Sequence, residues 1–177
     1  ADYLRYRAPD YQGAWKLRER AETRLPGSVV WLCRLPLIDS GAGRRLLWKL
    51  LLWIEQAIPT DRWVDGLIAA QDPDVVLVTP LVDLGSDQVD YIKSAHARGI
   101  RTGLCVHSWD NLTNKGLIRL LPDRVYLWNE FQKREAVEMH GMPAAHVLVT
   151  GAPVYDQWFS REPSTTREQF CKKVGLP

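Results

Sequence analysis

The stretch that decides the fold is Gln71-Asp72-Pro73-Asp74-Val75-Val76-Leu77-Val78-Thr79-Pro80, a short apolar run between turn residues. Three further runs of this kind begin at residues 102, 125 and 147. The intervals between them fit one strand, one helix and two loops each. Runs that are apolar throughout are typical of strands that a parallel sheet buries on both faces. We therefore predict four parallel neighbours in one sheet: Val75–Val78, Thr102–Val106, Val125–Leu127 and Val147–Val149.

Helix signals lie between these strands. Ser86 can cap a helix that ends at Gly99, and Asn129 can cap another that has Gln132 at the capping-box position. Residues 111–122 fit a loop with at most a short helix. The alternation predicts an α/β fold, a Rossmann-like parallel sheet with helices on both faces.

Residues 1–71 differ from residues 72–177, because they are basic, rich in Trp and mostly helical in pattern. Residues 43–57 and the segment after Thr60 read as helices. Residues 29–35 fit a strand or a helix, and the lack of a hairpin turn favours the helix. We predict a helical N-terminal region, 1–71, packed on a Rossmann-like domain, 72–177.

Composition excludes several classes of protein. The chain of 177 residues is 46% hydrophobic and 25% charged, with a formal net charge of +2. So small a net charge gives no support for a nucleic-acid binder. The longest apolar stretch, residues 46–58, is interrupted by Lys49 and Glu55 and is too short to span a bilayer. Three distant cysteines without ligand spacing predict neither a metal site nor a disulfide framework, and indicate a reducing cytoplasm.

The carboxyl ends of the predicted strands carry most of the polar side chains. Ligands of open parallel sheets bind at this edge. The densest segment is residues 107–116, where His107 or Asp110 could accept a proton from a substrate hydroxyl. We favour Asp110, because an adjacent indole, Trp109, could desolvate the carboxylate and raise its pKa. A purely structural loop is the alternative.

Other residues at this edge are candidates for binding the substrate. Lys115 could meet a phosphate or a carboxylate, while Ser86 and Asn129 are also explained as helix caps. Gly151 is also explained by a tight turn. The candidate binding residues are Asp83, Ser86, Ser108, Trp109, Asn111, Lys115, Asn129, Glu130 and Gly151.

The helix predicted around residues 44–58 has two interpretations. Basic and Trp side chains together could lie on an anionic membrane surface, whereas an ordinary buried helix explains the same pattern. The first interpretation adds peripheral contact with the inner face of a membrane to a cytoplasmic location. The residues concerned are Arg44, Arg45, Trp48, Lys49 and Trp53.

Residues 147–156, Val-Leu-Val-Thr-Gly-Ala-Pro-Val-Tyr-Asp, resemble the V-x-V-T-G-x-P-x-x-D segment that closes the N-terminal domain of GT-B glycosyltransferases and UDP-N-acetylglucosamine 2-epimerases. Trp128-Asn129-Glu130 precedes this segment as the equivalent helix does there. Residues 106–116, with Ser108-Trp109-Asp110-Asn111-Leu112, are similar to bacterial GT-B-like proteins of surface-polysaccharide type and loosely to CDP-glycerol glycerophosphotransferases. The resemblance covers about residues 74–177, and residues 1–71 match nothing.

The resemblance implies two facing Rossmann-like domains, with the acceptor in the first and a nucleotide-sugar donor, the co-substrate, mostly in the second. The chain ends about where the linker between them would begin, so we expect the donor domain to be absent and the fragment alone to be inactive. It also implies no metal and no resident cofactor. The partners it implies are a carbohydrate or lipid-linked acceptor and, through the missing domain, the donor.

Three functions follow as hypotheses. The first is the acceptor-side domain of a GT-B-type glycosyltransferase, with His107 or Asp110 as the base. The second is a sugar-nucleotide epimerase-like domain, which would need more carboxylates at the cleft than this chain offers. The third is a non-catalytic α/β module that binds a partner or a membrane through its Trp-rich region.

Overall fold

A computed structural model describes residues 1–83 and 85–177. Its sheet has four strands in the order β1-β2-β3-β4, and every neighbouring pair is parallel. The predicted α/β class and the parallel sheet are confirmed, and each predicted strand lies within one residue of an observed one. The strands are β1 (Val75–Val78), β2 (Arg101–Cys105), β3 (Arg124–Leu127) and β4 (Val147–Val149).

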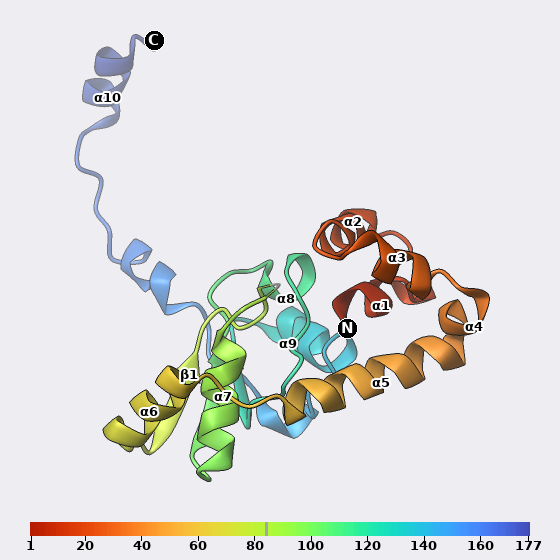
Figure 1. Cartoon of the computed structure of the whole chain (residues 1–177). Helices are drawn as coiled ribbons and strands as arrows, with labels where there is room; N and C mark the ends of the chain where they lie inside the picture. Colours follow the sequence, from red (N-terminus) through yellow and green to blue (C-terminus); the bar gives the residue numbers. More distant parts are fainter. Residues whose placement is uncertain (84) are drawn as a thin grey trace.

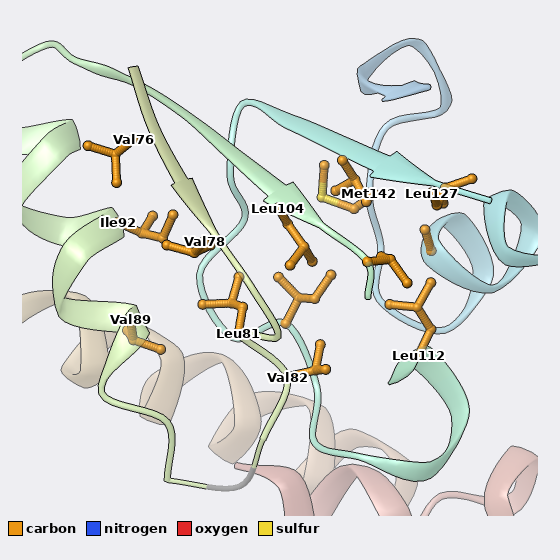
Figure 2. Packing of buried hydrophobic residues seen from close by; sticks show 14 of the residues in the cluster. Val76, Val78, Leu81, Val82, Val89, Ile92, Leu104, Leu112, Leu127 and Met142 are labelled. Atoms are coloured by element: carbon orange, nitrogen blue, oxygen red, sulfur yellow. The ribbon is translucent and has the colours of Figure 1, made fainter. Parts of the chain in front are cut away.

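The sheet core lies on one face. Side chains from β1 and β2 lie beside Val89 and Ile92 of helix α7 (Gln88–Ala97), while Leu127 of β3 lies beside Met142, as Figure 2 shows. Helix α6 (Arg62–Gln71) adds Val64 and Ile68 to this core, and α9 (Glu130–Glu138) adds Ala136. Parallel crossovers are right-handed. Because the strand order never reverses, successive crossovers fall on the same side of the sheet.

The other face of the sheet is exposed, contrary to the expectation of burial on both faces. Leu77 is 56% exposed, and Val75 and Leu148 on the same face are 49% and 40% exposed. Leu104 and Leu127, which point to the core, are 1% and 0% exposed as predicted. The expectation that both faces of the sheet are buried is therefore wrong, because among the described residues the helices that pack on the sheet core lie on one face, opposite Leu77.

The N-terminal region is helical, as predicted, and of residues 29–35 the first five lie in a helix and the last two in the turn after it, with no strand. Its core is separate from the sheet core and includes Tyr3, Tyr6 and Tyr11, together with Leu117 from the α/β part. Leu117 thus joins the two parts of the chain. The helices are α1 (Asp2–Tyr6), η1 (Pro9–Tyr11), α2 (Trp15–Glu22), α3 (Gly27–Cys33), α4 (Pro36–Asp39) and α5 (Gly41–Ala57).

The remaining helices are short. Helix α8 (Asn111–Asn114) interrupts the connection between β2 and β3, and η2 (Ala144–His146) precedes β4. After β4 come η3 (Pro153–Trp158) and α10 (Arg167–Val174), and Figure 1 shows α10 apart from the rest of the molecule. Over the residues described, no helix has the length and apolar character needed to cross a bilayer.

Candidate functional site

Two loops at the carboxyl edge of the sheet meet, as the parallel topology predicts. One follows β1 and carries Asp83; the other, residues 107–116, follows β2 and is called the site loop here. Lys115 Nζ lies 3.5 Å from Asp83 Oδ1. The Gly116 N–H also donates a hydrogen bond to the Val82 carbonyl. An ion pair and a backbone bond thus join loops that are distant in the sequence.

Asn111 fixes the start of the site loop. Its side-chain oxygen accepts hydrogen bonds from the backbone N–H groups of His107, at 3.1 Å, and Ser108, at 2.7 Å. The residue is only 2% exposed. We therefore assign Asn111 to the shape of the loop rather than to a ligand.

Gln132, which the sequence indicated only as a capping residue, connects the site loop to the end of β3. Its Nε2 donates to the Ser108 carbonyl at 3.1 Å, and its Oε1 accepts from the Trp128 N–H at 2.8 Å. Asn129 caps α9 as predicted, with its Oδ1 accepting from the Gln132 N–H at 2.9 Å. A buried amide at this position can form hydrogen bonds with the backbone of two loops at once. The capping pattern in the sequence does not reveal this second role.

The environment of Asp110 differs from the predicted one. The Ser108 hydroxyl donates to Asp110 Oδ1 at 2.5 Å, and Asn114 Nδ2 donates to Oδ2 at 3.3 Å. The Ser108 bond, followed by the Asn114 bond and the charge of Lys115, holds the pKa of Asp110 below its usual value. The expected rise of this pKa is wrong, because the hydrogen bond from Ser108 outweighs the desolvation of the carboxylate, and Trp109 itself is 72% exposed. Asp110 therefore remains ionised and is a hydrogen-bond acceptor rather than a base tuned to neutral pH.

His107 and Trp109 are exposed, as is Asn114 at the other end of the site loop. The backbone of His107 is held by Asn111, while its imidazole faces solvent beside the sheet edge. Neither side chain points into the core. The site loop thus presents an imidazole, an indole and an ionised carboxylate on a hydrogen-bonded frame.

The other predicted residues are less closely connected to the site loop. Ser86 Oγ accepts a hydrogen bond of 3.2 Å from the Gln88 N–H and supports the start of α7. Glu130 is exposed in the first turn of α9, and Gly151 has a φ of 83°. Among the described residues, no hydrogen bond or ion pair links Glu130 or Gly151 to the site loop.

A pocket of about 480 Å³ lies beside the site loop and is lined by Arg20, Arg24, Asp83 and Lys115. Arg20 comes from α2 and donates a 2.8 Å hydrogen bond to the Asn114 carbonyl, 94 residues away in the sequence. No sequence signal linked Arg20 or Arg24 to this edge, because α2, which carries Arg20, and the turn after it, which carries Arg24, lie outside the α/β pattern. A larger hollow, near Trp158 and Phe170, is lined, among the described residues, by the C-terminal segment 158–170.

The residues predicted for membrane contact fall into two groups, one that contacts other parts of the protein and one on the outer face of α5. Arg44 lies 2.9 Å from Asp39 Oδ1, and Trp48 lies under the guanidinium of Arg5. These two side chains therefore contact other parts of the protein. The outer face of α5 instead combines Arg45, Lys49 and Trp53 with three exposed apolar side chains, Leu46, Leu50 and Ile54.

Comparison with protein-family models, with curated proteins and with solved structures found no match in any of the three. Within residues 1–83 and 85–177, no group of three or more His, Cys, Asp or Glu side chains is placed to hold a metal ion.

Proposed function

We propose that the chain is the acceptor-side domain of a GT-B-type glycosyltransferase, which moves a sugar from a nucleotide-activated donor to an acceptor hydroxyl. The observation that carries this proposal is the site loop, whose exposed His107 and Trp109 stand beside the ionised Asp110 at the carboxyl edge of a parallel sheet. The resemblance of residues 106–116 and 147–156 to GT-B proteins supports the same reaction class.

In this mechanism His107 is the base. It takes the proton from the acceptor hydroxyl while the acceptor oxygen bonds to the anomeric carbon of the donor sugar. The bond between that carbon and the donor diphosphate breaks, and the nucleoside diphosphate leaves with the electron pair. Asp110, which stays ionised, accepts a hydrogen bond from a second acceptor hydroxyl. Trp109 provides an apolar surface for the sugar ring.

A binding experiment tests the acceptor side. Wild-type chain is applied to an oligosaccharide array, and the best binder is then titrated by calorimetry. We expect Trp109→Ala to weaken binding about fivefold, since an aromatic contact contributes about 1 kcal/mol beyond area burial. Trp63→Ala is the matched control, because Trp63 is 67% exposed and belongs to α6 rather than to the site loop. An equal loss of oligosaccharide affinity in both variants would contradict the assignment of the site loop to acceptor binding. It would favour a non-catalytic interaction module.

A transfer experiment tests the base. In a product of this gene that includes a donor-binding domain, His107→Ala should lower the rate of transfer roughly 10²–10⁴-fold, the usual range for a general base. His146→Ala is the control, because His146 ends η2 just before β4, at the amino edge of the sheet. Full transfer by the His107→Ala protein would exclude His107 as the base.

We also propose that the acceptor is presented at a membrane, which the outer face of α5 would contact. Leu46, Leu50 and Trp53 form an exposed apolar stripe flanked by the basic Arg45 and Lys49, the pattern of an interfacial helix. Leu50→Glu should abolish co-sedimentation with vesicles that contain phosphatidylglycerol. The control is Leu77→Glu, a similarly exposed leucine on the sheet. Unchanged sedimentation of Leu50→Glu would contradict this contact.

A further inference from the structure

The pocket lined by Arg20, Arg24, Lys115 and Asp83 has a charge unlike that of the whole chain. Three cationic side chains face one carboxylate, so the pocket is positive, whereas 23 Lys and Arg nearly balance 21 Asp and Glu in the sequence. Positive charge concentrated in a concave site raises the local concentration of anions. The pocket lies at the same sheet edge as the site loop, where ligands of parallel sheets bind.

The cations come from both parts of the chain. Arg20 and Arg24 belong to the N-terminal region, while Lys115 ends the site loop. Within the described residues, the hydrogen bond to the Asn114 carbonyl uses one of the five N–H donors of Arg20. The others can therefore serve a ligand. A planar guanidinium fork suits the geometry of an oxyanion, and an ammonium adds a compact charge beside it.

Contacts with the N-terminal region hold the pocket in place. The Tyr6 hydroxyl donates a 2.8 Å hydrogen bond to the Lys115 carbonyl, next to the Asn114 carbonyl that accepts from Arg20. Burial raises the pKa of Tyr6, so its hydroxyl remains a donor at neutral pH. Two neighbouring carbonyls of the site loop are thus fixed by α1 and α2, which reduces the ordering cost of binding.

We propose that this pocket binds a phosphate group, held by Arg20, Arg24 and Lys115. The pocket volume, about 480 Å³, exceeds that of a phosphate ion and leaves room for the molecule that carries it. The N-terminal region then has a function, because it completes a site that the α/β part begins. The proposal stands apart from glycosyl transfer, since phosphate binding needs neither His107 nor Trp109.

Asp83 limits the affinity of the pocket. Its carboxylate lies 3.5 Å from Lys115 Nζ, so it partly neutralises the cation and repels an incoming dianion. Removing this charge should therefore strengthen phosphate binding. Loss of one of the cations should instead weaken phosphate binding. The two opposite changes in affinity together identify electrostatic binding in this pocket.

The test is a titration of the 177-residue chain with inorganic phosphate and with pyrophosphate at low salt, followed by calorimetry and by amide NMR shifts of Asn114 and Lys115. Arg20→Gln and Lys115→Gln should each weaken binding about tenfold, as expected for one partly exposed charged contact. Asp83→Asn should strengthen it several-fold. Circular dichroism confirms folding, and two independent cation variants keep the test valid if one of them does not fold.

The matched control is Arg18→Gln, which removes the same charge from the same helix. Arg18 donates to the Gln12 carbonyl at 3.4 Å and does not line the pocket. The affinity of the Arg18→Gln protein for phosphate should equal that of the wild type. Equal weakening by Arg18→Gln and Arg20→Gln, or no saturable binding by the wild type, would overturn the proposal. His107→Ala should leave phosphate binding unchanged, so failure here and failure of the transferase proposal are distinguishable.

Discussion

The hydroxyl of Ser108 donates a 2.5 Å hydrogen bond to the carboxylate of Asp110, two residues along the site loop. This bond is the main reason why the pKa of Asp110 lies below its usual value. A carboxylate that accepts hydrogen bonds favours its charged form. The short contact therefore decides which residue of the site loop can act as a base.

Ser108→Ala should raise the pKa of Asp110, because the variant removes the largest stabilising contact of the ionised carboxylate. Carboxyl-carbon NMR titration measures the change. Asn114→Ala is the comparison, and it should raise this pKa by less, since the Asn114 bond is longer, at 3.3 Å. An unchanged Asp110 pKa in Ser108→Ala would contradict this account.

The stability of the protein should fall between pH 7.5 and pH 5.5 because of His140. The Ile118 N–H donates to Nδ1 of this buried ring at 3.1 Å, so the proton lies on Nε2, 2.8 Å from the Leu112 carbonyl. Burial lowers the pKa of His140. As the pH falls through about 6.5, the unfolded chain gains a proton that the folded chain does not yet bind, and the folded state loses up to about 1.4 kcal/mol per pH unit.

His140→Gln isolates this effect, because the amide retains one donor and one acceptor but does not titrate. Urea unfolding at several pH values should give a smaller loss of unfolding free energy for the variant than for the wild type. The acidic groups titrate in both proteins and cancel in the comparison. Identical slopes would show that His140 does not carry the pH dependence.

Substitutions at two leucines of the sheet test whether the core covers only one of its faces. Leu104→Ala should lower the free energy of unfolding by about 2–5 kcal/mol, because the side chain is 1% exposed and leaves a cavity. Leu77→Ala should cost less than about 1 kcal/mol, since its side chain is 56% exposed. Urea denaturation measures both. A large loss for Leu77→Ala would mean that its face of the sheet is covered in solution.

Two glycines should respond differently to an added methyl group. A Cβ at Gly43 would overlap the backbone carbonyl of Leu37 at the corner between α4 and α5, so Gly43→Ala should cost about 1–3 kcal/mol or more. A Cβ at Gly103 would lie 2.7 Å from Leu77 Cδ2 and 3.0 Å from Tyr126 Cε2, side chains that can move.

Gly103→Ala should therefore cost less than about 1 kcal/mol, the usual scale away from rigid contacts. Thermal unfolding monitored by circular dichroism compares the two variants. A larger loss of stability in Gly103→Ala than in Gly43→Ala would contradict the difference between a rigid and a movable neighbour.

Local patterns in the sequence determined the strands, the α/β class and the helix cap at Asn129. Each depends on residues close in the chain: an apolar run between turn residues, or a cap followed by Gln132. The residues at the carboxyl edge could also be predicted from the strands, because parallel strands all end on one side of a sheet.

Only the tertiary structure decided the rest. An apolar strand does not reveal which of its faces is covered, and the unbroken order β1-β2-β3-β4 leaves Leu77 exposed. The hydrogen bond from Ser108 lowers the pKa of Asp110, the reverse of the expected shift, and Trp109 beside it is exposed. Arg20 reaches the site loop across 94 residues, because α2 packs beside it. No local pattern encodes such a contact, since it depends on how two independently patterned parts of the chain dock.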